Sequence, residues 1–90
     1  MARLSDDEIK AKLAALQGWE RAGETIRKRY AFDTFKNAVS FVNRVAAIAE
    51  ELDHHPDILI EYNKVTLTLT SHDSGGLTGR DFRLADRVDT

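Results

Sequence analysis

The sequence predicts an α+β fold with the element order α-β-β-α-β-β-α, a four-stranded antiparallel sheet with three helices on one face. Three observations support this fold class. Two stretches of alternating apolar and polar residues each contain a turn signal, a long amphipathic helix separates them, and a capped helix stands near each end of the chain. Because 90 residues build one modest core, we expect residues 1–90 to form a single domain.

Residues 5–16 are expected to form the first helix. Ser5 and Glu8 make a capping box, in which each side chain can accept a hydrogen bond from the backbone N–H of the other residue. Gly18 is a natural place for this helix to stop. The helix carries one apolar stripe at spacings of four and three, formed by Ile9, Leu13 and Leu16.

Residues 19–32 are expected to form the first hairpin, with a turn at residues 22–24. Lys28 weakens this prediction, because it shares the parity of the residues expected to face the core, which are Ile26, Tyr30 and Phe32. Trp19, at the start of the hairpin, is expected to belong to the core rather than to a ligand site.

Residues 34–52 give the clearest helix, with Asp33 or Thr34 as its cap. Its apolar stripe is broad and consists of Phe35, Ala38, Phe41, Val42, Val45, Ile48, Ala49 and Leu52. A stripe this wide can contact both the sheet of its own chain and a partner helix, so we expect a homodimer or homotetramer. The alternative is that the stripe serves core packing alone.

Residues 57–70 are expected to form the second hairpin, with a two-residue turn at residues 63–64. Its second strand alternates Val65, Leu67 and Leu69 with threonines. Residues 72–76 are expected to form a loop. Residues 78–88 then form the last helix, which begins with a second capping box made by Thr78 and Asp81.

Composition excludes several classes of function. Thirteen basic against fifteen acidic residues give a net charge of −2, which argues against a nucleic-acid partner; residues 27–29 are the only basic cluster. The sequence contains no cysteine, so no disulfide or thiol nucleophile is available. It shows neither a signal peptide nor an apolar run long enough for a membrane, and we therefore expect a cytoplasmic protein.

All three histidines are expected to meet at one corner of the fold. His54 and His55 lie between the long helix and the next strand, where Pro56 favours an extended chain before it. His72 follows the last strand, and the hairpin returns that strand's end to the start of its partner. Because imidazole both gives and accepts protons near pH 7, this corner is a candidate acid/base site.

Other interpretations of these residues remain open. The histidines could be surface groups at a helix end, where positive charge is favourable. A metal site is a further alternative, but adjacent histidines chelate poorly and no metal-binding spacing is present, so we expect no metal. Glu50 could orient a histidine from one turn before His54, or be a solvated acid. Asp81 is first a capping acid, but it could also face the site.

The run Glu50-x-x-x-His54-His55-Pro56, followed by Tyr62, His72 and Asp81, resembles the signature of the pterin-4a-carbinolamine dehydratases. Further similarity extends over nearly the whole chain. The resemblance implies a four-stranded antiparallel sheet with three helices on one side. It implies that His54, His55 and His72 are the active-site histidines and that Glu50 and Asp81 support them, with Pro56 beside the substrate.

The resemblance also implies a reaction, the loss of water from 4a-hydroxytetrahydropterin to give quinonoid dihydropterin. This would regenerate the pterin used by aromatic amino acid hydroxylases, chiefly phenylalanine hydroxylase. No metal and no organic cofactor would take part. Two alternatives are a protein-interaction module that uses the long helix, and a catalytically weak relative with a role in molybdopterin metabolism or protein assembly. The intact histidine set favours the enzyme.

Overall fold

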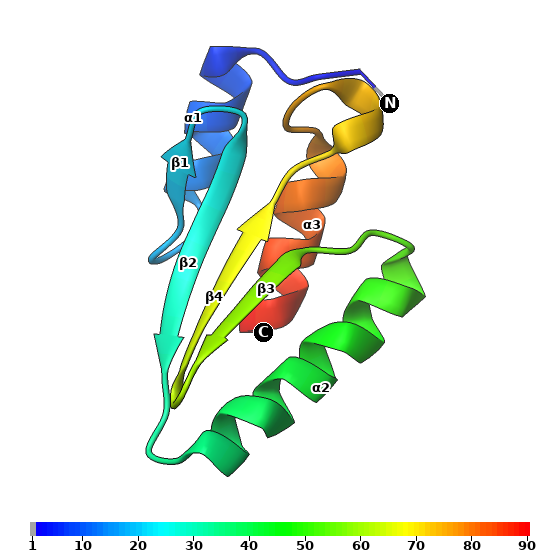
Figure 1. Ribbon diagram of the computed structural model, residues 1–90. Helices are drawn as coiled ribbons and strands as arrows, with labels where there is room; N and C mark the ends of the chain where they lie inside the picture. The colour runs from blue at the N-terminus through cyan, green and yellow to red at the C-terminus, as the bar shows by residue number, and fades with distance from the viewer. Residues whose placement is uncertain (1) are drawn as a thin grey trace.

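The computed structural model describes residues 2–90 and confirms the predicted order of elements (Figure 1). The helices are α1 (Asp6–Ala14), α2 (Phe35–Leu52) and α3 (Gly79–Asp89). The strands are β1 (Glu20–Ala22), β2 (Thr25–Ala31), β3 (Asp57–Glu61) and β4 (Lys64–Leu69). A short 3-10 turn, η1 (His72–Ser74), lies within the predicted loop.

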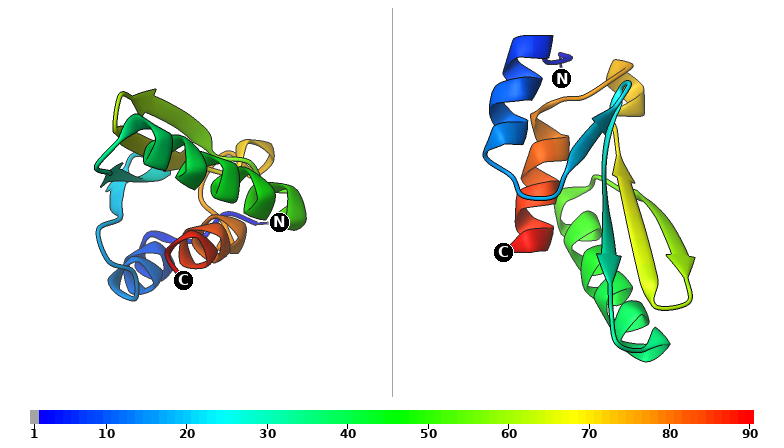
Figure 2. Two further views of the ribbon diagram at one scale, coloured as in Figure 1. Left: turned by 90° about the horizontal axis from the view of Figure 1, so that it is seen from below. Right: turned by 90° about the vertical axis from the view of Figure 1, so that its left-hand side faces the viewer.

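The four strands form one antiparallel sheet in the order β1-β2-β4-β3, and the helices cover one of its faces (Figure 2). The central pair aligns Ile26 with Leu69 and Tyr30 with Val65, so the apolar parity of both strands faces the helices. The core lies between the sheet and the helices. Its fully buried members include Ile26, Val45, Val65, Leu67, Leu69, Leu77, Leu84 and Val88.

Both predicted capping boxes are present. Glu8 N–H donates to the Ser5 hydroxyl and Ser5 N–H donates to the Glu8 carboxylate, at 3.2 and 2.9 Å. The same arrangement begins α3 with Thr78 and Asp81. Between the two candidate caps of α2 the structure selects Thr34, whose hydroxyl accepts from the Asn37 N–H at 3.0 Å. Local sequence therefore fixes where each helix begins.

Two predicted boundaries were wrong. The second hairpin turns at residues 62–63 rather than 63–64, because Lys64 already pairs with Glu61 in the ladder. Tyr62 adopts a left-handed φ of 54°, a conformation that the sequence pattern did not indicate for an aromatic residue. The first helix ends at Ala14, before Leu16, and positive φ at Gly18 follows within the connection to β1.

Lys28 lies on the face of β2 that points toward the core, but its charged group is not buried in the core. Its ammonium group reaches the edge of the core, where it donates to the Asp89 carboxylate at 3.0 Å and to the Gln17 carbonyl at 2.9 Å. Trp19 lies in the core as predicted and is 6% exposed. The lysine that weakened the strand prediction is therefore accommodated by its length.

The stripe of α2 is covered only in part. Ala38, Val45, Ile48 and Ala49 are buried, but Phe35 at the start of the helix is 52% exposed. The other exposed large apolar residues lie on β3 and the turn that follows it, and they are Leu59, Ile60 and Tyr62. Among residues 2–90, no helix has both the length and the apolar character that crossing a membrane requires.

Candidate active site

A sharp reversal of the chain at Asp53 directly precedes the two adjacent histidines. Helix α2 ends at Leu52, and Asp53 caps it in the left-handed region with φ 50°. The His54 N–H then donates back to the Ala49 carbonyl at 3.0 Å, and β3 begins directly after the half-buried Pro56. As a result, His54 turns into the protein while His55 stays on its surface.

His54 forms a buried pair with Asp81. The histidine is 8% exposed, the aspartate is fully buried, and Nε2 of His54 lies 2.6 Å from Oδ1 of Asp81. The two side chains come from different elements, since His54 follows α2 and Asp81 lies in the first turn of α3. A buried carboxylate bonded to an imidazole is an arrangement that orients the ring and sets which nitrogen holds the proton.

The second oxygen of Asp81 is held by the start of α3 itself. Oδ2 accepts the Thr78 N–H at 3.0 Å, which is the capping bond, and the Ser71 hydroxyl at 2.9 Å. Thr78 and Ser71 are also bonded to each other through their hydroxyls at 2.8 Å. Asp81 therefore caps its helix and contacts a histidine at the same time.

His55 pairs with Glu50 on the surface, through Nε2 and a carboxylate oxygen. Simple helical spacing would place Glu50 beside His54, which follows it by four residues. The left-handed Asp53 ends the helix before that turn is complete, so the contact falls on His55 instead. Both side chains of the pair are more than half exposed to solvent.

His72 is the exposed first residue of η1. Asp57 pairs with Thr68, so the hairpin does return the end of β4 to the start of β3. Within residues 2–90, however, no hydrogen bond or ion pair joins His72 to His54 or His55. The connection is indirect: the residue before His72 is Ser71, which is bonded to the Asp81 that holds His54.

The loop that carries His72 is fixed from several sides. Leu4 N–H donates to the Leu77 carbonyl at 2.8 Å, and the Arg3 guanidinium donates to the Gly75 carbonyl at 3.1 Å. The loop also lies close to the first hairpin, because a Cβ added at Gly76 would meet the carboxylate of Glu24. The N-terminal segment and the first hairpin thus help to set the position of this loop.

Arg80 adds a charged contact beside the same loop. Its guanidinium donates to Asp73 at 2.6 Å, and this hydrogen bond holds the pKa of the Asp73 carboxyl below its usual range. The backbone N–H and Nε of Arg80 also lie 3.2 and 3.4 Å from the Thr78 hydroxyl. Arg80 therefore links η1 to the start of α3.

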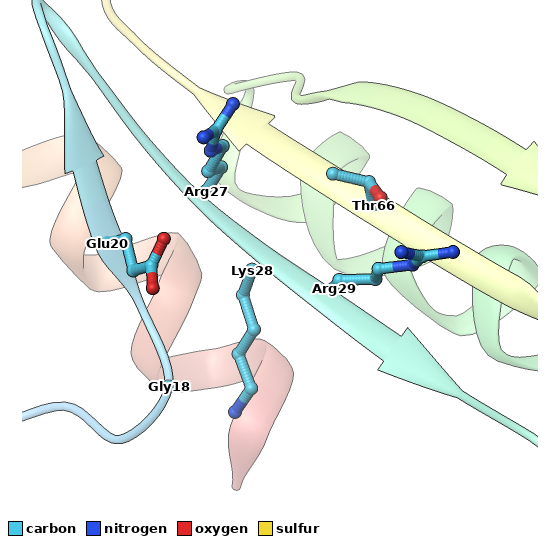
Figure 3. Close-up of a pocket in the computed structure, with 6 residues that line it drawn as sticks. All are labelled: Gly18, Glu20, Arg27, Lys28, Arg29 and Thr66. Atoms are coloured by element: carbon cyan, nitrogen blue, oxygen red, sulfur yellow. The ribbon is translucent and has the colours of Figure 1, made fainter.

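Neither a hollow nor a metal-binding cluster identifies the site. A hollow of about 440 Å³ lies between β1, β2 and β4, and its lining consists of Gly18, Glu20, Arg27, Lys28, Arg29 and Thr66 (Figure 3). Lys28 points away from Arg27 there, toward the contacts described above. No histidine lines this hollow. Among residues 2–90, no three His, Asp or Glu side chains are placed to hold a metal ion.

Sequence reasoning missed two members of this arrangement. Ser71 immediately precedes His72, and this proximity to a candidate histidine was the only signal available for it. Arg80 lies inside the second capping box, next to Asp81, where a sequence pattern gives no information on the direction of its side chain. The contacts of both residues depend on how the loop packs against α3.

Comparison with known families gives one consistent result. The family model described as "Pterin 4 alpha carbinolamine dehydratase" matches residues 2–90. A relative from Thermomicrobium roseum is 51% identical over 88 residues, which cover 98% of this chain and 95% of the relative. A relative from Mycobacteroides abscessus is 47% identical over 90 residues, which cover 100% of this chain and 96% of the relative. Both are named pterin-4-alpha-carbinolamine dehydratase.

Solved structures give the same fold. A transcriptional coactivator/pterin dehydratase from Brucella melitensis superposes with a TM-score of 0.92 at 36% identity, over 97% of this chain and 95% of that chain. A pterin dehydratase-like protein described as a RuBisCO assembly factor in the alpha-carboxysome superposes with a TM-score of 0.70 at 29% identity, over 81% and 87%.

Proposed function

Because the chain belongs to the pterin 4 alpha carbinolamine dehydratase family, we propose that it removes water from a 4a-hydroxytetrahydropterin by histidine acid/base catalysis. The product is the quinonoid dihydropterin. The observation that carries the proposal is the buried His54–Asp81 pair, one residue from His55 and joined through Ser71 to the loop of His72. The names of the relatives support the same activity.

The reaction needs one acid and one base that work near neutral pH. The substrate carries a hydroxyl on a carbon bonded to a ring nitrogen. An acid protonates the departing oxygen, the carbon–oxygen bond breaks, and water leaves. A base removes the proton from the nitrogen, whose electrons form the C=N bond. Imidazole serves either step, with a pKa near 6.5 in its ordinary state.

We assign the proton transfers to His54 and His72 and the binding of the pterin ring to His55. His54 is oriented by a buried carboxylate. His72 begins η1 directly after Ser71, which is bonded to the same carboxylate, and this supports the proposal that the two histidines flank one substrate carbon. His55 is exposed beside Pro56 and paired with Glu50, which suits it to a ring edge. The mechanism requires no metal and no organic cofactor.

The cellular role follows from the product. A quinonoid dihydropterin is the form from which a reductase regenerates tetrahydropterin, so the enzyme serves the recycling of pterin for an aromatic amino acid hydroxylase such as phenylalanine hydroxylase, in the cytoplasm. The uncovered apolar residues support a homodimer or homotetramer, which light scattering would detect. A monomer at micromolar concentration would contradict this part of the proposal.

The decisive experiment is a direct dehydration assay on 4a-hydroxytetrahydropterin generated in place by a hydroxylase. Dehydration well above the spontaneous rate, at catalytic amounts of protein, supports the proposal. Its absence in folded protein would favour a second candidate, a protein-interaction module. That candidate is favoured by the exposed apolar residues and by the assembly-factor description of one structural relative.

A further inference from the structure

A directed chain of hydrogen bonds leads from the start of α3 to His54. It begins at Arg80, whose backbone N–H donates to the Thr78 hydroxyl at 3.2 Å. The chain runs through the Ser71 hydroxyl to Asp81 and ends at the imidazole of His54. Ser71, Thr78 and Asp81 are at most 1% exposed, so water does not compete for these bonds.

The direction of each bond follows from counting hydrogens. A hydroxyl has one hydrogen to donate, and Ser71 gives its own to Oδ2 of Asp81 at 2.9 Å. The 2.8 Å contact between Ser71 and Thr78 must therefore be donated by Thr78. Oδ2 also accepts the Thr78 N–H, so the carboxylate presents its other oxygen, Oδ1, to His54.

Ser71 is oriented in an unusual way for its position. It is the residue that caps η1, and a serine at such a position usually bonds a backbone N–H of the turn it precedes. Here its side chain makes no capping bond and turns inward to Asp81. The hydroxyl is therefore used to fix the carboxylate rather than the turn that carries His72.

We propose that Ser71, supported by Thr78, is a positioning residue that fixes Asp81 so that His54 keeps its proton on Nε2 and uses Nδ1 toward the substrate. The bond to Oδ1 holds a proton on Nε2 in both charge states of the ring. Within residues 2–90, Nδ1 of His54 has no hydrogen-bond partner. Every fully buried side-chain nitrogen or oxygen in the same residues has a partner, so Nδ1 is not fully buried. Nδ1 is therefore in at least partial contact with solvent.

Long-range ¹H–¹⁵N NMR of the histidine rings tests this assignment without any activity measurement. At about pH 8.5, where ordinary imidazoles are neutral, His54 should show the Nε2–H form in the wild type and in Ser71→Thr, which keeps the hydroxyl. Ser71→Ala should show a mixture of both forms. Thr70→Ala is the matched control, because it removes a hydroxyl bond to the Glu24 carbonyl one residue away, and it should leave the Nε2–H form intact.

Asp81→Asn gives the sharper result. The two donors at Oδ2 would hold the amide oxygen, so the amide NH₂ would face His54 and force the proton onto Nδ1. In serine proteases the comparable change, which produces the wrong tautomer, lowers kcat by about 10⁴-fold. We expect an inverted tautomer and a loss of similar order here, and for Ser71→Ala a fall in kcat of about tenfold or more with little change in KM.

The outcomes separate this inference from the proposed function, on which its catalytic readout rests. If Ser71→Ala keeps the Nε2–H form, or Thr70→Ala disturbs it equally, the positioning role is wrong. A wild type that shows Nδ1–H yet dehydrates the pterin overturns the inference alone. A wild type with the expected ring state and no activity overturns the proposed function alone. Should Asp81→Asn fail to fold, the two Ser71 variants still decide.

Discussion

Helix α3 has an aspartate at each end, and each gathers three donors. At the N-terminal end, Asp81 accepts from His54, from the Ser71 hydroxyl and from a backbone N–H. At the C-terminal end, Asp89 accepts from the Trp19 indole at 2.8 Å, the Lys28 ammonium at 3.0 Å and the Tyr30 hydroxyl at 2.5 Å. Both carboxylates accept three hydrogen bonds, but the donor groups are different.

The partners decide what each end can do. Indole, ammonium and phenol groups keep their protons near neutral pH, so the carboxylate of Asp89 can only hold β2 and the chain around Trp19 against α3. Imidazole changes its protonation near neutrality, and His54 retains one nitrogen in contact with solvent. A carboxylate with three donors is therefore a structural clamp at one end of the helix and part of a candidate active site at the other.

The largest effect is expected from variants of the candidate active site, at the N-terminal end of α3. His54→Ala and His72→Ala should each lower kcat by about 10²–10⁴-fold, the usual cost of losing a proton-transfer group. The double variant should nearly abolish turnover. Steady-state kinetics on 4a-hydroxytetrahydropterin would measure these changes, with thermal unfolding of each variant as a check, because His54→Ala also leaves Asp81 buried without its ring partner. If kcat were nearly unchanged in both single variants, the Asp81 end of α3 would have no catalytic role to distinguish it from the Asp89 end.

Replacing Asp89 should produce the opposite pattern. In Asp89→Ala the part-buried Trp19 indole N–H loses its acceptor, so we expect the free energy of unfolding to fall by about 1–3 kcal/mol while kcat is unchanged. Asp86→Ala is a suitable control, since it removes the same charge from an exposed position in the same helix. Urea unfolding measures the difference. A drop in kcat with unaltered stability would show that this end also takes part in catalysis.

His55→Ala should have a smaller effect on activity, mainly a rise in KM, because we assign this exposed residue to binding of the ring. Glu50→Gln is its companion, since it weakens the surface pair without removing the imidazole, and it should raise KM less. If His55→Ala lowered kcat most and left KM intact, His55 would be the acid and the assignment of roles would be wrong.

The smallest expected effect is in acid. Burial alone would raise the pKa of Asp89, but hydrogen bonds from Tyr30, Trp19 and Lys28 outweigh it and hold that pKa below its usual range. A carboxyl with a lowered pKa in the folded state stabilises above its unfolded pKa of about 3.9 and loses this contribution as pH falls through the folded value. The free energies of unfolding of the wild type and of Asp89→Asn, measured as a function of pH, should therefore converge below about pH 4. Parallel curves down to the lowest pH would argue against the clamp.

Local patterns in the sequence predicted most of the fold. The capping boxes at Ser5 and Thr78 indicated where two helices begin, because their bonds are made within four residues. The alternation around Val65 and Leu67 indicated which face of β4 is buried. The second turn was displaced by one residue, since pairing across the sheet placed Tyr62 in a conformation that its own propensity disfavours.

The candidate site was predictable only in part, because its contacts join elements that are distant along the chain. The histidines and Asp81 were identified as candidates, but the pairing of His54 with Asp81 depends on how α2 and α3 pack together. Ser71 could not be distinguished from an ordinary loop serine. In the same way, no sequence pattern indicated that Asp89 collects donors from residues more than 50 positions away.

The strand order also has a kinetic consequence. Strands β3 and β4 are neighbours in the chain, so their hairpin closes over a short loop, but β2 pairs with β4 across 33 to 43 residues that include all of α2. The chain must lose the entropy of closing that long segment before most of the stabilising contacts between β2 and β4 can form. We therefore expect the β2–β4 pairing to limit the folding rate. Ile26→Val should then slow folding more than Ile58→Val does, and stopped-flow refolding would reveal the reverse order if the hairpin were limiting.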